Sequence, residues 1–265
     1  MQVSSPLKVV SRIALLLATA IFLTACATSQ DPAERTDGIN DPYERQNRNV
    51  HAFNKELDTS LIRPLAQGYA VVPVEIRDRV NDFSDNISEP GNAINSLLQG
   101  DLRGVGVSVV RFAMNTTVGL AGFVDAASEL GIRENQTDFG ETLAVWGVDE
   151  GAYIELPLFG PSTQRDTVGL VVDFFTNPLT FATVDNSPER YIPPTARGAA
   201  GLNNRDKLKG TFDSVLYDSA DSYALSRSIY LQNRRFELEG STGEEVDPFA
   251  TDPYGSPDEI DPYAE

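Results

Sequence analysis

The sequence predicts an all-α fold. Apolar side chains recur every three or four residues in most segments of residues 41–239, which is the spacing of one face of a helix. Pro and Gly separate these segments, as expected where helices begin and end. Only residues 152–156 alternate apolar and polar side chains, and they run into Pro157, so we expect a short extended segment there and no sheet. We expect a single domain at residues 41–239.

The chain begins with a segment typical of a signal peptide. Lys8 and Arg12 give it a positive start, and an apolar run extends from Ile13 to Leu23. That run is too short to cross a bilayer, since a transmembrane helix takes about 20 apolar residues. We therefore interpret residues 1–25 as a removable signal peptide.

The apolar run ends in Leu-Thr-Ala-Cys at residues 23–26, which resembles the lipobox of bacterial lipoproteins. In a lipobox the cysteine thiol receives a diacylglycerol, and the signal peptide is cut off before it. Cys26 is the only cysteine, so it does not belong to a disulfide framework. The alternatives are an ordinary secretory signal with a chance cysteine, or a buried core cysteine. Ala27 follows instead of Asp, which by resemblance to the sorting rule of many Gram-negative bacteria favours the outer membrane.

The composition limits what the protein binds. The chain carries 39 Asp and Glu against 21 Lys and Arg, a net charge of −18. Removal of the signal peptide takes away only bases, so the mature protein is more acidic still. Such a surface repels nucleic acid and adsorbs poorly to anionic lipid. Membrane contact must therefore come from acyl chains and apolar faces.

A polar tether at residues 26–40 precedes the first predicted helix. Asp41 is suited to the N-cap of this helix and Pro42 to its first position. Arg63-Pro64 is predicted to end it, because Pro disfavours a helical conformation in the residue before it. The apolar stripe of this helix consists of Tyr43, Val50, Phe53 and Leu57.

Two further helices are predicted before residue 101. The first opens at Pro73 and is broken at Glu89-Pro90-Gly91, and the second is short and stops at Gly100. Apolar and charged side chains take opposite faces of the longer helix, which is typical of a helix with one face on the core. The apolar stripe consists of Ile76, Val80, Phe83 and Ile87, and the charged face of Glu75, Arg77, Asp78, Arg79 and Asp82.

Residues 102–124 differ from the other segments because they are apolar on nearly all sides and rich in Gly and Val. Arg103, Arg111 and Asn115 interrupt them. One interpretation is a buried core helix followed by a Gly-containing turn. The other is a segment in contact with lipid, and the two are compatible. A simple transmembrane helix is not expected, because a central Arg costs roughly 2.5–3.5 kcal/mol in a bilayer.

The second half of the domain is also predicted to be helical. Ser162 is expected to cap one of its helices, and Asn177-Pro178 to end that helix. Residues 185–204 contain several Pro and Gly and are expected to be irregular. The remaining predicted helices are Asp125 to Leu130, ending at Gly131, Asp138 to Trp146, ending at Gly147, and two marked by Leu208 to Leu216 and Tyr223 to Phe236.

The last residues, 240–265, contain many acids, no bases and repeated Asp-Pro pairs. They cannot bury enough apolar area to offset their chain entropy, so we expect a disordered tail. Such a tail either adds only solubility or, as a flexible anionic arm, raises the encounter rate with a soluble partner.

Candidate catalytic residues are few. His51 is the only histidine and is expected at the surface of the first helix, without a catalytic role. Asp138 and Glu141, or Asp166, offer carboxylates for glycoside hydrolysis. A capping box with Asp138 as N-cap explains the spacing to Glu141 without catalysis. No metal site, phosphate-binding loop or cofactor is predicted, and we do not expect an enzyme.

Many short motifs follow one another over roughly residues 40–235. They include Asn40-Asp41-Pro42-Tyr43-Glu44, Leu98-Gln99-Gly100, Asn115-Thr116-Thr117, Phe139-Gly140-Glu141-Thr142-Leu143, Trp146-Gly147-Val148, Gly160-Pro161-Ser162 and Tyr230-Leu231-Gln232-Asn233-Arg234. Their order and spacing together resemble the MlaA (VacJ) family of outer-membrane lipoproteins.

The resemblance implies a ring-shaped, all-helical lipoprotein in the inner leaflet of the outer membrane. Such proteins are thought to remove mislocalised phospholipids from the outer leaflet through an amphipathic channel, which maintains lipid asymmetry. They pass the lipid to the periplasmic carrier MlaC and associate with trimeric porins. The candidate lipid-contact or channel residues are then Arg103, Arg111, Phe112, Asn115 and Phe123. A porin-associated structural lipoprotein and a periplasmic glycan hydrolase are the alternative functions.

Overall fold

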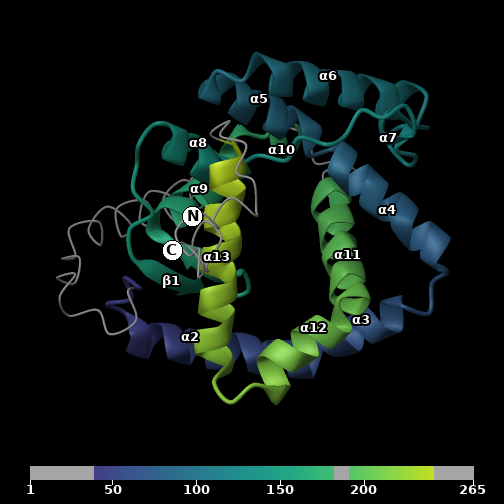
Figure 1. Cartoon of the computed structure of the whole chain (residues 1–265). Helices are drawn as coiled ribbons and strands as arrows, with labels where there is room; N and C mark the ends of the chain where they lie inside the picture. Colours follow the sequence, from purple (N-terminus) through teal and green to yellow (C-terminus); the bar gives the residue numbers. More distant parts are fainter. Residues whose placement is uncertain (1–38, 182–190, 242–265) are drawn as a thin grey trace, which may run out of the picture.

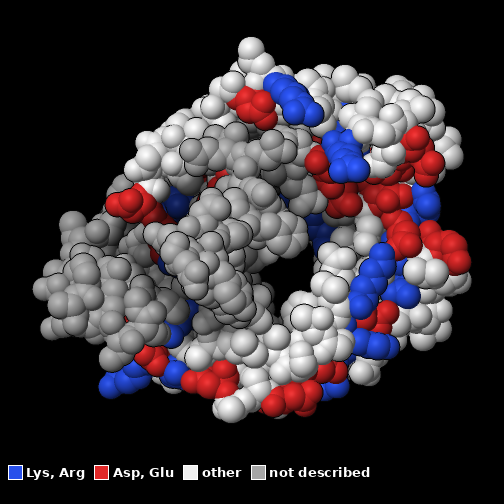
Figure 2. Space-filling view, viewed as in Figure 1, with Lys and Arg blue, Asp and Glu red and all other residues white. Residues whose placement is uncertain are grey.

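The computed structural model describes residues 39–181 and 191–241, and these residues form a ring. Helices and one small hairpin follow each other around a central opening, which Figure 1 shows between α13 and α11. The opening persists when all atoms are drawn (Figure 2). The predicted all-α fold is confirmed, and the chain has the ring shape that the resemblance implies.

The first half of the described chain runs along the bottom of the ring in Figure 1, then up its right side and across its top. Here α2, η2 and α3 continue one into the next, and α5 lies along α6. The elements are α2 (Glu44–Leu57), the π-helical segment η2 (Asp58–Ile62), α3 (Arg63–Tyr69), α4 (Val74–Asn86), α5 (Glu89–Gln99), α6 (Leu102–Thr117), α7 (Ala126–Glu129) and α8 (Phe139–Val145).

The second half of the chain closes the ring. α9 packs on α8, α11 packs on α3 and α4, and α13 crosses the left side of the opening in Figure 1. The elements are β1 (Tyr153–Leu156), β2 (Gly160–Thr163), α9 (Gln164–Thr176), α10 (Pro178–Phe181), α11 (Ile192–Lys207), α12 (Lys209–Asp213), the π-helical segment η4 (Ser214–Asp218) and α13 (Ser222–Ser241).

The hairpin corrects the prediction of an extended segment without a sheet. β1 pairs with β2 in antiparallel register, with Tyr153 opposite Thr163 and Leu156 opposite Gly160. At the turn, Leu158 and Gly160 have positive φ angles of 72° and 79°. Gly adopts this conformation at no steric cost, which is why the chain can reverse here within three residues.

Two predicted helix starts are wrong. Ser162 lies in β2, and the side chain that caps α9 belongs to Thr163. Asp41 does not cap the first helix, because α2 begins at Glu44. Asp41 is instead buried, with 6% exposure, and its carboxylate forms a 2.6 Å ion pair with Arg227 of α13.

Proline does not end the helices at two places where the sequence predicted an end. The first helix passes Arg63-Pro64 by way of η2 and continues as α3. The wider π turn lets the Arg63 amide donate to the carbonyl of Asp58. Pro64 then lies in the first turn of α3, where its missing N–H leaves no bond unmade. Glu89-Pro90-Gly91 likewise begins α5 instead of ending the preceding helix.

Residues 185–204, predicted to be irregular, are helical from residue 192 onward, and residues 182–190 lie outside the described part of the chain. Pro193 and Pro194 are in the first turn of α11, where backbone amides have no partner within the helix. Ala196 and Ala200 are buried, so α11 packs closely on α3 and α4.

Local signals for helix ends are confirmed. Gly100, Gly131 and Gly147 follow the helices that they were predicted to end, with φ angles of 80°, 79° and 83°. Asp138 caps α8, since its Oδ1 accepts a 2.8 Å hydrogen bond from the Glu141 amide. These features depend on neighbours in the sequence, which explains why the sequence predicts them well.

The distribution of polar and apolar side chains is the opposite of that in a typical water-soluble domain. Among the described residues, buried side chains are mostly polar or charged, whereas many large apolar side chains are exposed. On α4, Ile76 of the predicted core stripe is 55% exposed. Arg77 of the predicted solvent face is buried and binds Asn203 at 2.7 Å and Asp206 at 3.0 Å. The predicted orientation of α4 is therefore wrong at these two positions, whereas Ile87 is buried and Glu75 and Arg79 are exposed, as predicted.

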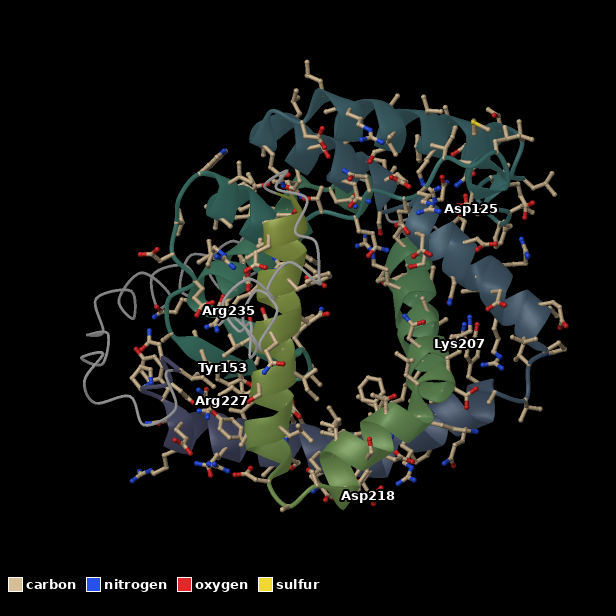
Figure 3. The ribbon with its side chains drawn as sticks, viewed as in Figure 1. Asp125, Tyr153, Lys207, Asp218, Arg227 and Arg235 are labelled. Carbon is tan, nitrogen blue, oxygen red and sulfur yellow. The ribbon has the colours of Figure 1, made fainter. Side chains whose placement is uncertain are left out.

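Buried or partly buried ion pairs join different segments of the ring, and we call them the joint ion pairs. Each joins a carboxylate to an Arg on another element, at 2.6–3.0 Å. Figure 3 shows Arg227 and Tyr153 on one side of the ring, and Asp125 and Lys207 on the other. The joint ion pairs are Asp41–Arg227, Asp58–Arg205, Glu89–Arg111, Asp206–Arg77 and Asp138–Arg234.

Apolar packing inside the wall is limited. Tyr153 of β1 packs with Tyr223 and Leu231 of α13 in a small buried cluster. In the part of the chain that the structure describes, no helix combines the length and the apolar character needed to cross a membrane.

Candidate functional site

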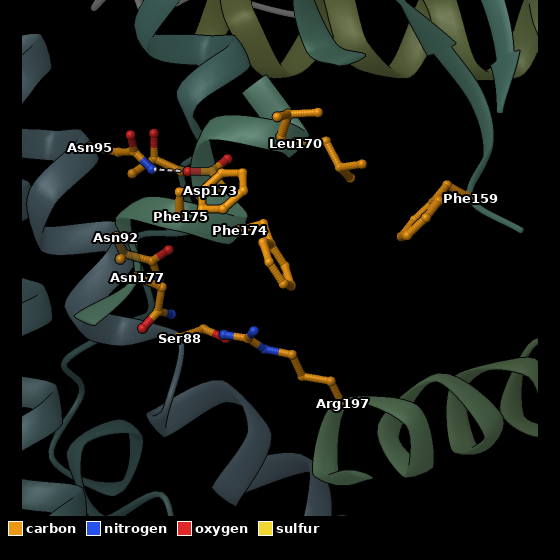
Figure 4. A pocket seen from close by; sticks show the side chains of 13 residues that line it. Ser88, Asn92, Asn95, Phe159, Leu170, Asp173, Phe174, Phe175, Asn177 and Arg197 are labelled. Carbon is orange, nitrogen blue, oxygen red and sulfur yellow. Dashed lines mark hydrogen bonds between the residues drawn. The ribbon is translucent and has the colours of Figure 1, made fainter. Parts of the chain in front are cut away.

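An apolar cavity opens into the ring between α5, α9 and α11. Its volume is about 630 Å³, which is within the range of small-molecule sites. Figure 4 shows Phe159, Leu170 and Phe174 directed into this space, with Arg197 extending from α11 opposite them. The lining residues are Ser88, Gly91, Asn92, Asn95, Thr137, Phe159, Leu170, Val171, Asp173, Phe174, Phe175, Asn177 and Arg197.

The apolar wall of this cavity follows from the way α9 packs. Gly169 is buried against α8, and a Cβ at this position would come within 2.3 Å of the Gly140 backbone. This close contact fixes one face of α9 on α8 and leaves the other face uncovered. Leu170 and Phe174 lie on the uncovered face, 41% and 61% exposed. Such side chains suit a site that receives an apolar ligand.

A polar end closes the same cavity on the α5 side. Asn95 donates a 2.8 Å hydrogen bond to Asp173, and the amide of Phe139 donates to the other carboxylate oxygen at 2.9 Å. Burial raises the pKa of Asp173 despite these two donors. Asn177 is buried and donates to the carbonyl of Ile87. The cavity is thus amphipathic, with an apolar wall on α9 and amides and a carboxylate beside it.

A second, polar cavity of about 730 Å³ adjoins the first and shares Ser88, Asn92 and Thr137 with it. Carboxylates dominate its wall, and Arg234 is its only cation among the described lining residues. We refer to it as the acidic cavity. The rest of its lining consists of Asp85, Glu134, Asn135, Gln136, Asp138, Glu141 and Glu237.

Burial, together with neighbouring like charges, raises the pKa of Asp85. Burial, with the nearby carboxylates of Glu134, Asp82 and Asp125, raises the pKa of Asp85 to about 6. The folded protein then holds a proton on Asp85 more strongly than the unfolded chain does. Ionised Asp85 therefore lowers the stability of the fold above pH 6, and this penalty disappears as the pH falls below about 4.

We expect Asp85→Asn to raise the free energy of unfolding at pH 7.5 by roughly 1 kcal/mol, after allowance for solvent screening. At pH 4 the variant and the wild type should unfold alike. Thermal denaturation at both pH values tests this, with Asp218→Asn as a control because Asp218 is exposed and away from the cavities. An equal gain at both pH values would show that the charge of Asp85 is not the cause.

A third cavity, of about 490 Å³, lies between α2, the hairpin, α12, η4 and α13. Phe159 lines both this cavity and the apolar cavity, so the hairpin tip stands between them. Apolar side chains of the C-terminal helices form much of its wall, including Leu208, Phe212 and Ile229.

His51 contradicts its predicted surface position. It is buried at 6% exposure, with Nδ1 3.2 Å from Glu155 and Nε2 3.1 Å from Ser222. Tyr153 also donates to Glu155. These contacts tie α2 to β1 and to the start of α13, so the histidine joins three elements of the ring.

The candidate residues of α6 and the turn after it differ in burial. Arg111 and Asn115 are 2% exposed and face protein, where Arg111 binds Glu89 at 2.6 Å and Asn115 donates to Asp125 at 3.0 Å. Arg103 is exposed, Phe112 is half-buried, and Phe123 stacks on Phe83 with ring centroids 4.7 Å apart. None of the five candidates lines the three cavities described above.

The exposed surface of α5, α6 and the following turn is apolar. Figure 2 shows few charged atoms over α6, while acidic and basic residues gather over α4 and α11. We call this region the α5–α6 surface. Its exposed apolar residues are Leu97, Leu98, Leu102, Val109, Val110, Val118, Leu120 and Phe123.

The carboxylates considered for catalysis have structural partners. Asp138 caps α8 and pairs with Arg234 at 2.7 Å. Asp166 accepts hydrogen bonds from Tyr230 and Thr163 and lies 3.3 Å from Arg234. No group of three or more His, Cys, Asp or Glu side chains in the described ranges has the arrangement of a metal site. Cys26, the predicted lipidation site, lies outside those ranges.

Four site residues were not predicted from the sequence: Phe159, Leu170, Phe174 and Arg197. A signal for two of them was present, because Leu170 and Phe174 make the apolar stripe of α9 too wide for one buried face. Nothing in the sequence near Arg197 indicated that α11 would bring it opposite α9.

Comparison with known proteins gives consistent results. The family model of the MlaA lipoprotein matches residues 39–237. The intermembrane phospholipid transport system lipoprotein MlaA of Escherichia coli K12 is 33% identical over 232 residues, covering 86% of this chain and 88% of its own. Its counterpart in Haemophilus influenzae is 34% identical, covering 84% and 88%. An uncharacterized protein of Rickettsia prowazekii is 36% identical over 203 residues, covering 76% and 79%.

A solved structure is also similar to the ring. It is described as the structural basis for maintenance of bacterial outer membrane lipid asymmetry, and it superposes with a TM-score of 0.64 at 29% sequence identity. The match covers 75% of this chain and 98% of that one.

Proposed function

The chain belongs to the MlaA lipoprotein family of intermembrane phospholipid transport, and we propose that it moves phospholipids through the opening of its ring. The observation that carries this proposal is the apolar cavity, whose Phe159, Leu170 and Phe174 side chains are uncovered beside a polar end. Acyl chains pack on the apolar wall, and the polar end accommodates a headgroup. Transport of this kind needs no nucleophile.

The α5–α6 surface supports a position within a membrane leaflet. Eight exposed apolar side chains lie on this surface, and each fully covered Leu or Val is worth roughly 1.5–3 kcal/mol. Arg111 does not contact lipid in this arrangement, because it is buried against Glu89. Within residues 102–124, we therefore assign the predicted lipid contact to the exposed apolar side chains, which include Phe123.

The remaining parts of the proposal concern place and partners. We assign residues 1–25 to a signal peptide, 26–40 to a lipidated tether, 41–239 to the ring domain and 240–265 to an acidic tail. The protein is anchored in the outer membrane on its periplasmic side, takes phospholipid from the outer leaflet and delivers it to a periplasmic carrier of the MlaC kind. A trimeric porin holds it in the membrane. Two likenesses support these roles: the E. coli relative belongs to an intermembrane transport system, and the similar solved structure concerns outer membrane lipid asymmetry.

Lipid content and lipid transfer test the proposal. The full chain is purified in detergent, its bound lipids are identified by mass spectrometry, and labelled phospholipid is then followed from vesicles to the protein. We expect bound phospholipid and saturable uptake. Porin binding without lipid binding would favour a structural lipoprotein. Loss of function in Asp138→Asn or Asp166→Asn with the fold intact would favour a hydrolase.

We expect Cys26→Ser to accumulate as an uncleaved precursor, because signal removal at a lipobox awaits the diacylglycerol. Loss of the acyl chains also removes about 0.8 kcal/mol of membrane binding per buried CH₂. Intact mass and membrane fractionation check both effects, with Ala27→Ser as the neighbouring control. Normal processing and unchanged fractionation of Cys26→Ser would show that the lipobox interpretation is wrong.

A further inference from the structure

Arg197 is a cation in an apolar surrounding. It projects from α11 into the apolar cavity, on the side opposite Phe174 (Figure 4). Partial burial against the cavity wall lowers the pKa of Arg197. The side chain nevertheless remains accessible from the opening of the ring.

Arg197 also has no protein partner in the part of the chain that the structure describes. Arg77, Arg111, Arg205 and Arg234 each contact a carboxylate at 3.0 Å or less. A guanidinium is strongly stabilised when an anion is bound by its planar fork of donors. An accessible, partly desolvated Arg in an open cavity, with no carboxylate beside it among the described residues, is therefore suited to an anionic group of a ligand.

The acidic cavity begins where the polar rim of the apolar cavity ends. Ser88, Asn92 and Thr137 line both, so the cavity that holds Arg197 adjoins the one that holds Asp85 and Glu134. Those carboxylates repel an anion, and they add to burial, the main cause, in raising the pKa of Asp85. A cationic group that follows the anion would be attracted. Phosphate and amine are joined in this order in a zwitterionic phospholipid.

We propose that Arg197 binds the phosphate of a zwitterionic glycerophospholipid, that the amine of its headgroup points to the acidic cavity, and that its acyl chains pack on Phe159, Leu170 and Phe174. This inference deepens the proposed function and rests on it. It predicts that an amine-bearing lipid binds more tightly than an anionic lipid with the same acyl chains.

Four probes separate the parts of this site. The detergent-solubilised full chain is titrated with short-chain phosphatidylethanolamine, phosphatidylglycerol and diacylglycerol of equal acyl length, and with inorganic phosphate. Phosphatidylethanolamine should bind most tightly. Arg197→Gln should weaken it about tenfold to a hundredfold, the range expected for a charge-assisted contact, and leave diacylglycerol unchanged. Arg197→Lys should retain part of the affinity, since it keeps the charge without the fork.

Two controls complete the design. Arg45→Gln removes an exposed Arg of α2 that lines none of the three cavities, and it should leave every affinity unchanged. Asp85→Asn combined with Glu134→Gln should abolish the preference for phosphatidylethanolamine over phosphatidylglycerol. Thermal denaturation confirms that each variant is folded.

The outcomes distinguish this site from the proposed function. If the wild type binds none of the lipids, the proposed function fails. If it binds them and Arg197→Gln binds phosphatidylethanolamine equally well, the headgroup site is wrong while the function stands. If inorganic phosphate displaces the lipid from the wild type but not from Arg197→Gln, the site serves free phosphate and the lipid assignment is overturned.

Discussion

The Arg111→Leu variant is expected to lose roughly 3–5 kcal/mol of unfolding free energy, the cost of removing one partner from a buried ion pair. Arg111 is 2% exposed and its Nε donates at 2.6 Å to Glu89, which is fully buried. It also bonds to Ser128, Asp125 and the carbonyl of Ile132. Leu fills most of the volume, so the loss comes from Glu89, which would be left as an uncompensated charge.

The pH dependence of this loss identifies its cause. Burial raises the pKa of Glu89 even beside Arg111, whereas its carboxylate partners raise the pKa of Arg111. The desolvation penalty therefore falls on Glu89. Without Arg111 the pKa of Glu89 rises further, so the folded variant takes up a proton more readily than the unfolded chain. Its deficit should shrink as the pH is lowered from 8 toward 5.

Denaturation of three variants at these pH values measures the effect. In the double variant Glu89→Gln and Arg111→Leu the buried charge is gone, so much of the stability should return. Arg79→Leu breaks the exposed pair with Asp82 and should cost under about 1 kcal/mol. A deficit in Arg111→Leu that stays constant with pH would point to lost packing instead of the stranded carboxylate.

The Phe174→Asp variant is expected to bind phospholipid at least about 100-fold more weakly than the wild type. Phe174 is 61% exposed and lines the apolar cavity, so it is available to acyl chains. The change removes roughly 1.5–3 kcal/mol of apolar contact. It also places a carboxylate against hydrocarbon, which adds a desolvation cost, and every 1.4 kcal/mol is about tenfold in affinity.

Fluorescent phospholipid titration and vesicle uptake measure this loss. The stability of the ring should change little, because Phe174 covers no buried core. Phe236→Asp is the matched control, since Phe236 is similarly exposed at 66% but lines none of the three cavities. Wild-type affinity in Phe174→Asp would place the acyl chains elsewhere on the ring.

Features that depend on nearby residues could be predicted from the sequence. The all-α class, the helix ends at Gly100 and Gly147 and the cap at Asp138 all follow from local backbone chemistry. Pro193 and Pro194 were misjudged because proline breaks a helix interior but fits a first turn, and only the position of the helix start distinguishes the two. A π turn such as η2, which carries the chain past Pro64, has no reliable sequence signal.

The side chains that face the ring opening could not be predicted, because the rule that apolar stripes face a core fails here. Ile76 is exposed and Arg77 is buried, since apolar side chains lie on the exposed faces of the ring and its joints are polar. His51 was expected at the surface for the same reason, as its partner Glu155 is 104 residues away. Arg197 lines the cavity only because the fold places α11 opposite α9.

The wall of the ring is thin (Figure 1), so it has an outer and an inner surface and little interior between them. Molecules that cover either surface bind the folded ring and not the unfolded chain. By mass action they raise the apparent stability in proportion to the logarithm of their concentration. On the proposed function, the bilayer and the transported lipid are two such molecules, so the measured stability of the ring depends on both. A melting temperature in one detergent is accordingly a property of the protein–detergent pair, and comparisons between variants hold only at a fixed detergent concentration.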